Sequence, residues 1–476
     1  MRARSCWRTP LPAGDRPLNR RGQILAGVVV TWLLVTAAPA LAHGGISGRT
    51  DLPVPLWLFV FGAATALIVS FVALSALWTE PRFEGRPTAS ARPSWIQSIL
   101  TNRGLEWTIR IVMLVFFVVV AMASARRLSD TETIGPVVVY AWFWVGLAIA
   151  HALFGNLWAT LSPFDTIGRL VGLDENERET PPRPYPPVWG KWPAAVLLFG
   201  FVWVELVQPF GSVPGHLGIL IVVYTLIQIA GMQLFGRRVW IENGEAFGVY
   251  FGLISGMAPL TRDPNGRVVL RPVLSGLAKI KPRPGLLAVI LVALGSTTFD
   301  GFSRSDTWIA WTAGLGGRVR TVAFTAGLLA VIGLVTLAYV MAMRAAARVV
   351  SGHWHPLAVR FAHSLVPIML AYVVAHYFSF LVLEGQLGLV RLSDPFGLDW
   401  DLFGTDDWIM NLALISPTTI WYVQVAAIVI GHVGGVVLAH DRAIAMFDSE
   451  AAVRTQYALL AVMILFTASG LLILSG

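Results

Sequence analysis

The residues best suited to chemistry in this chain are histidines and carboxylates inside apolar segments. Four of the nine histidines lie between residues 363 and 440, on two apolar segments joined by an acidic loop. Ionisable side chains are costly at the depth of a lipid bilayer, so those found there are usually paired and functional. The first candidates in this stretch are His363, His376, Glu384 and His432.

His376 and Glu384 belong to a predicted outer layer of polar groups that also contains Asp300 and Asp394. Imidazoles and carboxylates without a thiolate can bind a divalent metal such as zinc or copper, which lowers the pKa of a bound water. In this interpretation Asp300 or Glu384 is a general base, and His376 is a metal ligand or proton carrier. His376 and Glu384 are about 12 Å apart along a helix, so they share an ion only if the helix ends between them. Alternatively, Glu384 and the loop aspartates are ordinary surface charges. The other members of the layer include Glu205, Gln208, His216 and Gln424.

His43 is a further candidate metal ligand, because it follows the small-x-small pattern Ala40-Leu41-Ala42 that typically precedes a signal-peptide cleavage site. An N-terminal histidine offers an α-amine, a backbone amide and a ring nitrogen, a chelate that suits Cu(II). A histidine at this position also occurs by chance.

A predicted inner layer holds His151, His363 and His432, roughly 10 to 15 Å from the cytoplasmic ends of their spans. These histidines could bind haem b between helices or form a proton path. His363 and His376 lie about 220° apart around one helix, so they face different sides unless Pro367 kinks the span. A haem pair would therefore have to join different spans, such as His363 with His432. The favoured alternative is that the inner imidazoles are neutral and make helix-packing hydrogen bonds.

The elements that position these residues are membrane spans. The 476-residue chain is 56% hydrophobic and 13% charged, with a mean hydropathy of +0.68, and apolar runs long enough to cross a bilayer recur throughout. We therefore predict an all-α, polytopic helix bundle with a single domain over residues 43–476. The net charge of +8 comes from basic residues that flank spans, which indicates membrane lipids rather than nucleic acid as partners. The single cysteine, Cys6, excludes disulfides and thiolate sites from the mature chain.

A basic leader and an apolar run over residues 1–42 predict a cleaved signal peptide. Ten spans follow, near 54–78, 107–124, 137–160, 192–208, 215–235, 285–300, 321–343, 357–382, 417–440 and 455–475. With both mature termini outside, the predicted cytoplasmic loops hold 21 Lys and Arg residues and the outer segments hold 7. This asymmetry follows the positive-inside rule.

Three loops are long. Two are predicted to be cytoplasmic, 162–191 and 237–284, and the second contains an apolar piece, AFGVYFGLISGM, that lies in the interface or re-enters the membrane. The third, 384–416, is acidic and is expected to close over the outer layer. The sequence does not indicate an oligomeric state.

Several segments resemble the bacterial multi-span proteins that carry the name fenitrothion hydrolase. They are HGGISGRTDLPVPLWLF, STTFDGFS, HSLVPIMLAYVVAHYFSFLVLEGQ, SDPFGLDWDLFGT and WYVQVAAIVIGHVGGVVLAHDRA. The resemblance covers most of the mature chain. It implies a hydrolase of the bacterial inner membrane that cleaves organophosphorus triesters at the aryl ester, and it brings no assigned catalytic residues.

The sequence therefore predicts a membrane-embedded, metal-assisted hydrolase of apolar esters with its site at the outer face. The second hypothesis is a non-enzymatic permease or copper-handling protein that passes an ion from His43 towards the inner histidines. A haem-bearing electron carrier is the third.

Overall fold

The computed structural model describes residues 55–83, 97–98, 101–126, 133–173, 183–213, 215–263, 266–405 and 407–475. Helices dominate these residues, and their one sheet is an antiparallel hairpin of β1 (Leu260–Arg262) and β2 (Val268–Leu270), with Leu260 opposite Leu270. The predicted all-α class is confirmed. The predicted signal peptide and His43 lie outside the described residues.

Nine helices in the described part of the chain are long and apolar enough to cross a membrane. The protein is therefore a multi-pass membrane protein. The nine are α2 (Leu56–Leu77), α4 (Arg103–Ala125), the π-helix η1 (Val137–Gly146) with α5 (Leu147–Phe154), α9 (His216–Phe235), α12 (Leu286–Ser303), α14 (Gly317–Val349), a helix formed by α15 (Trp354–Phe361), η3 (Ala362–Leu365), α16 (Val366–Leu383) and α17 (Gly385–Ser393), α18 (Pro417–Met446), and α19 (Ser449–Ser475).

The remaining predicted span corresponds to α8 (Trp192–Val207), an apolar helix of 16 residues. Hydrogen bonds join loops that the topology assigns to the same side. The Tyr140 hydroxyl donates to Gly211 O at the predicted outer end, whereas the backbone N–H of Lys191 donates to Pro284 O at the predicted cytoplasmic end. These contacts agree with the predicted alternation of the spans.

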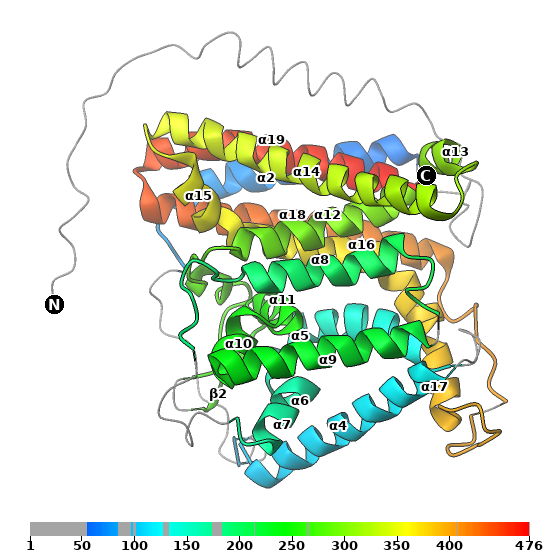
Figure 1. The fold of residues 1–476 in the computed structure, drawn as a ribbon. Helices are drawn as coiled ribbons and strands as arrows, with labels where there is room; N and C mark the ends of the chain where they lie inside the picture. The colour runs from blue at the N-terminus through cyan, green and yellow to red at the C-terminus, as the bar shows by residue number, and fades with distance from the viewer. Residues whose placement is uncertain are drawn as a thin grey trace. The chain divides into compact units, whose positions relative to one another are not determined.

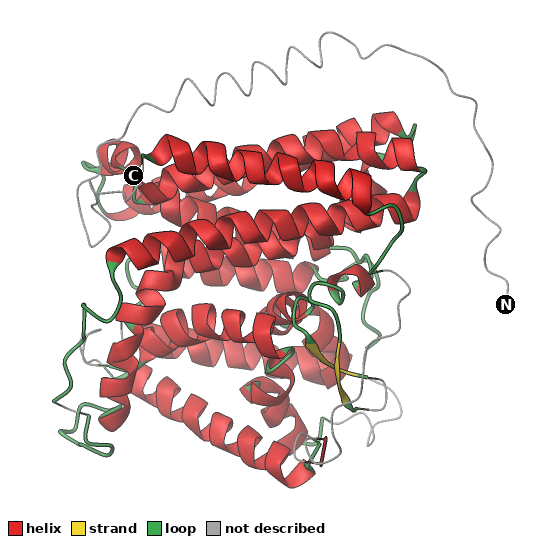
Figure 2. Cartoon of the chain, turned by 180° about the vertical axis from the view of Figure 1, so that it is seen from behind, coloured by secondary structure: helices red, strands yellow, loops and turns green. Residues whose placement is uncertain are grey.

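The central spans are α12, α16 and α18, which lie side by side in Figure 1, with α14, α19 and α2 on one side and α8, α9 and α4 on the other. Figure 2 shows the helices and the β-hairpin from behind. Glycines let α16 and α18 approach closely, because a Cβ atom added to Gly431 would lie 2.3 Å from the Ala371 Cβ. The largest core cluster extends from these helices to Trp144 of η1 and Tyr250.

The segment between α9 and α12 folds into the bundle instead of forming only a solvated loop. In this segment α10 (Arg237–Asn243) lies along α9, where Trp240 Nε1 donates to Gln228 Oε1 at 2.8 Å. The next helix, α11 (Ala246–Ser255), packs against α5, α8 and α16, and most of its side chains are buried. The apolar piece is therefore buried inside the helix bundle. The remaining short helices are α6 (Trp158–Leu161), α7 (Pro163–Leu170), η2 (Leu277–Lys279) and α13 (Asp306–Thr312).

Candidate functional site

The candidate site is an acid–base pair between α12 and α16. His376 Nε2 lies 2.8 Å from Asp300 Oδ2, although the two residues are 76 positions apart in the chain. Asp300 is only 4% exposed, and the His376 side chain is 14% exposed. The direct packing of α12 against α16 brings the two side chains together. The structure thus joins two residues that the sequence placed in one layer on separate helices.

The buried Asp300 carboxylate has two further partners. Arg304, one turn later, places Nε 3.3 Å from Oδ1, and the Tyr377 hydroxyl also interacts with the carboxylate. A buried carboxylate is costly unless it is paired and hydrogen-bonded, and these groups supply that pairing. Asp300 can therefore stay ionised while it orients the His376 ring. The sequence analysis missed both partners, although the four-residue spacing from Asp300 to Arg304 is a usable signal.

A cavity of about 20 Å³ adjoins the His376 ring between α12, α16, α18 and α19. A space of this size holds about one water molecule. The adjacent Cε1–Nδ1 edge of the ring lies towards Gly301, which lines the cavity, because a Cβ atom added to Gly301 would lie 3.7 Å from both ring atoms. The His376 ring is therefore positioned between a carboxylate and a water-sized space. The lining residues are Thr297, Thr298, Gly301, Tyr372, Ala375, His376, Ile428, Gly470 and Ile473.

A second carboxylate, Glu205 of α8, lies close enough to Asp300 and Arg304 to interact with them by charge. Its Oε2 atom is buried and has no hydrogen-bond partner within the described residues. The Tyr250 hydroxyl and the Trp144 indole N–H are likewise buried and unpartnered there, and their rings stack at 4.9 Å. The polar region beside Asp300 therefore extends from α12 towards η1 and α11.

Two other predicted outer residues, Glu384 and Asp394, do not join this pair. Glu384 keeps helical backbone angles where α16 runs into α17, so it stays about two turns beyond His376. Asp394 follows α17 and accepts the backbone N–H of Leu398 at 2.9 Å. Burial acts to raise the pKa of Asp394, but backbone N–H groups of the following turn outweigh burial and hold the pKa below its usual value.

Within the described ranges, no three His, Cys, Asp or Glu side chains are grouped to hold a metal ion. Of the predicted metal ligands, Asp300 and His376 lie together, and Asp394 is not grouped with them. His43 lies outside the described residues, so its role stays a prediction. A pair of ligands does not fit the predicted centre, and we derive no step through a metal.

The inner histidines are held by their own helices. His363 Nδ1 lies 2.9 Å from Arg360 O, and His432 Nδ1 lies 2.8 Å from Ile428 O. In the region of His363 and His432, the two helical segments are in close contact, because a Cβ atom added to Gly435 would lie 2.8 Å from Ser364 O. This packing leaves no gap for a porphyrin between His363 and His432, so we derive no haem chemistry.

His151, the third inner histidine, is positioned by three contacts. Its Nδ1 donates to Leu147 O at 2.6 Å, its Nε2 accepts the backbone N–H of Trp158 at 2.9 Å, and its ring stacks on Phe251. The Trp158 indole in turn donates to Glu245, a buried carboxylate that caps α11. These contacts fit the packing interpretation of His151. The sequence analysis missed Glu245, because glutamate is not among the residues that typically cap a helix N-terminus.

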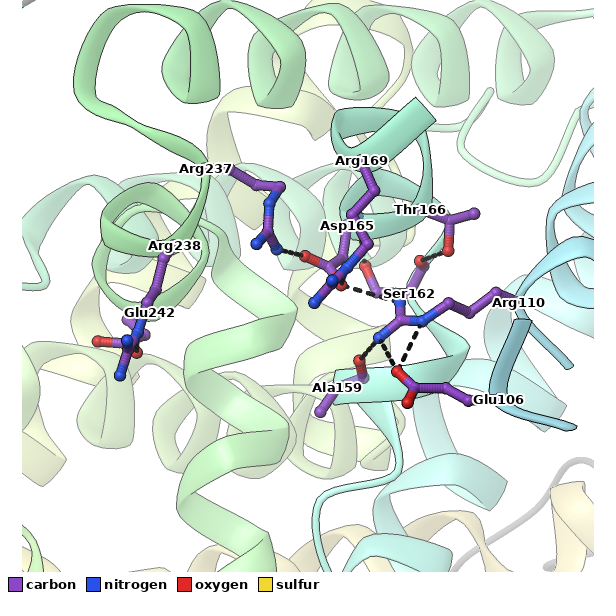
Figure 3. Close-up of polar contacts among 10 residues, drawn as sticks. All are labelled: Glu106, Arg110, Ala159, Ser162, Asp165, Thr166, Arg169, Arg237, Arg238 and Glu242. Carbon is purple, nitrogen blue, oxygen red and sulfur yellow. Dashed lines mark hydrogen bonds and ion pairs between the residues drawn. The ribbon is translucent and has the colours of Figure 1, made fainter. Parts of the chain in front are cut away.

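A second buried group of charges, drawn in Figure 3, ties α4, α7 and α10 together. The Asp165 carboxylate accepts from Arg110 at 2.9 Å, from Arg169 at 3.0 Å and from Arg237. Because these charges pair with one another, the group is best explained as a structural ion-pair network that holds the three helices together. The sequence analysis missed it because residues from three segments contribute.

Compared with known proteins, the chain matches no family model, no curated protein and no solved structure.

Proposed function

We propose that this multi-pass membrane protein hydrolyses apolar esters at the Asp300–His376 pair. The observation that carries the proposal is the 2.8 Å contact between His376 Nε2 and Asp300 Oδ2, with a water-sized cavity beside the same ring. The resemblance to proteins named fenitrothion hydrolase supports organophosphorus triesters as the substrate class. Such esters partition into lipid and can approach a site between membrane helices.

In the proposed reaction, Asp300 fixes the tautomer of His376. Nε2–H donates to the carboxylate, so the Nδ1 lone pair faces the cavity. Nδ1 takes a proton from water, the water oxygen bonds to phosphorus, and the aryl ester bond breaks to release an aryloxide. Asp300 stabilises the imidazolium, which then gives its proton to the aryloxide or to bulk water. Asp300 thus acts through His376.

Arg304 is proposed to stabilise charge on the phosphoryl oxygen. Its side chain is 70% exposed and uses Nε and one terminal nitrogen towards Asp300. A guanidinium carries five N–H donors, so others can face a substrate. Preorganised donors of this kind stabilise negative charge that develops in the transition state. Arg304 would therefore select substrates with a phosphoryl or carbonyl oxygen.

The test is release of 4-nitrophenol from a 4-nitrophenyl phosphotriester by purified protein in lipid nanodiscs. The variant His376→Gln is expected to lose hydrolysis. The matched control is His355→Gln, because His355 is exposed on α15 and makes no contact with the pair. If the wild-type protein cleaves neither phosphotriesters nor carboxylic esters, the proposed function is overturned. Full activity of His376→Gln would overturn the proposed site.

A second candidate function, a permease coupled to protons or cations, is favoured by Glu205. Two neighbouring buried carboxylates bind a proton or cation readily, because both cannot stay charged at low cost. Glu205→Gln should leave ester hydrolysis intact if the protein is a hydrolase alone. Loss of ion uptake by proteoliposomes in this variant, with no ester cleavage by the wild type, would favour the permease.

A further inference from the structure

The loop between α17 and α18 exposes an unusual number of large apolar side chains. Eight of them are exposed within residues 398–414, and Ile409 is 90% exposed. Many exposed apolar side chains on one loop indicate a site of contact with another protein or with a membrane. The eight are Leu398, Trp400, Leu402, Phe403, Trp408, Ile409, Leu412 and Leu414.

Small polar side chains fix this loop to α17. The Thr405 hydroxyl donates to Leu389 O at 3.0 Å and lies 2.8 Å from Ser393 Oγ, which also accepts the backbone N–H of Phe403 at 3.0 Å. Thr405 and Ser393 are both buried. Further along, the Gln386 side chain exchanges two hydrogen bonds with the backbone of residue 411. The loop therefore buries the small polar side chains that hold it to α17 and exposes its large apolar side chains.

The loop is continuous with the lipid-facing surface. It leaves a membrane-spanning helix at Ser393 and returns to α18 at Pro417. At its start, Leu392 and Phe396 pack against the ends of α4 and η1, and the neighbouring Met122 of α4 is exposed, as expected for a side chain in lipid. Figure 1 shows the loop beside α17, away from α13 and the outer end of α12. The loop therefore begins at the end of a membrane-spanning helix, beside an exposed apolar side chain that suits lipid.

Exposed carboxylates limit how deeply the loop can enter a lipid bilayer. Asp399, Asp401 and Asp407 are exposed between the apolar residues, and ionised carboxylates do not enter the hydrocarbon. Tryptophans such as Trp400 and Trp408 favour the level of the lipid headgroups. An acidic loop is repelled by anionic lipid, so its chemistry fits zwitterionic headgroups.

We propose that residues 394–405 and 407–416 belong to a membrane-anchoring loop that inserts its apolar side chains into the headgroup region of the leaflet at the predicted outer face. The carboxylates stay at the water boundary, and the hydrogen bonds to α17 hold the loop in this orientation. This inference does not depend on the ester hydrolysis proposed above.

The test uses nitroxide labels, because Cys6 is the only native cysteine and Cys6→Ser removes it. Ile409→Cys and Asp407→Cys are labelled in the full chain and reconstituted into phosphatidylcholine liposomes. The ratio of collisions with oxygen to collisions with a water-soluble nickel chelate is expected to be several-fold higher at 409 than at 407. If Ile409→Cys does not fold, Leu414→Cys provides a second exposed apolar position.

Equal access of the nickel chelate to both labels would place the loop in water and overturn the proposal. Protection of position 409 in native membranes but not in liposomes would also overturn it, because a protein partner would then cover the loop. Thr405→Val is expected to increase the mobility of the label at 409, because it removes the anchor to Ser393 and Leu389. An unchanged line shape would contradict the proposed anchoring.

Discussion

Replacing Asp300 with asparagine keeps the shape of the side chain but is expected to reverse the hydrogen bond to His376. In the native pair, Nε2–H donates to the carboxylate and Nδ1 faces the cavity as an acceptor. An asparagine amide can donate to Nε2, which moves the imidazole proton to Nδ1. Nδ1 then cannot take a proton from water, so the variant loses its general base.

The size of the effect follows from that lost role. General-base catalysis contributes roughly 10²- to 10⁴-fold to rate. At about 1.4 kcal/mol for each factor of ten, Asp300→Asn should raise the activation free energy by about 3–6 kcal/mol. The fold should survive, because the charge left behind is that of Arg304, whose side chain is 70% exposed.

The assay measures kcat/KM for the phosphotriester in nanodiscs between pH 6 and 9, together with the midpoint of thermal unfolding. Asp306→Asn is the matched control, because it makes the same change six residues later, in the first turn of α13. Asp300→Glu, which restores a carboxylate, should recover part of the activity. If Asp300→Asn is as active as the control, the tautomer argument is refuted.

Three further outcomes are expected. In Gly301→Ala, the new Cβ would lie 2.5 Å from Ile473 Cγ2 and disturb the cavity, so kcat should fall, and Ile473→Ala in the same chain should restore it in a double-mutant cycle. Asp165→Asn should lower the free energy of unfolding by about 3–5 kcal/mol, because it removes the carboxylate that the buried Arg110 and Arg237 share. Glu242→Gln, at an exposed pair, should cost less than about 1 kcal/mol, and denaturant titrations can measure both effects. Burial, followed by a neighbouring arginine, lowers the pKa of Lys191 to about 8, so competitive acylation should titrate near pH 8 in the folded chain. Because the unfolded chain keeps this proton up to about pH 10.5, Lys191 should make stability rise with pH across that window.

The spans could be predicted from sequence because hydropathy alone determines them. The predicted span 285–300 corresponds to Leu286–Ser303, and 357–382 lies inside the continuous helix Trp354–Ser393. Hydropathy does not give the helix face, because these helices are apolar nearly all round. The pairing of Asp300 with His376 therefore needed the structure, although both residues could be selected as polar groups at membrane depth.

The segments read as loops were harder to predict. The aspartates of 384–416 suggested a solvated lid, but the orientation of that loop depends on Thr405 and Ser393, whose short hydroxyl side chains carry no such signal in the sequence. The basic residues of 237–284 suggested a cytoplasmic loop, so Glu245 was not predicted to be buried. The four hydrogen-bond donors to Glu245 come from α6, α9 and its own helix. Burial of a charged residue depends on partners that sequence spacing cannot supply.

The burial of α11 has a consequence for biosynthesis. Its apolar side chains pack partly against α16, which begins at Val366, about 110 residues after α11 ends at Ser255. At roughly 5–20 residues per second, a ribosome needs on the order of ten seconds to make that interval. During that time α11 would lack one of its final neighbours, so a chain truncated before Val366 should expose this helix to chaperones and membrane proteases.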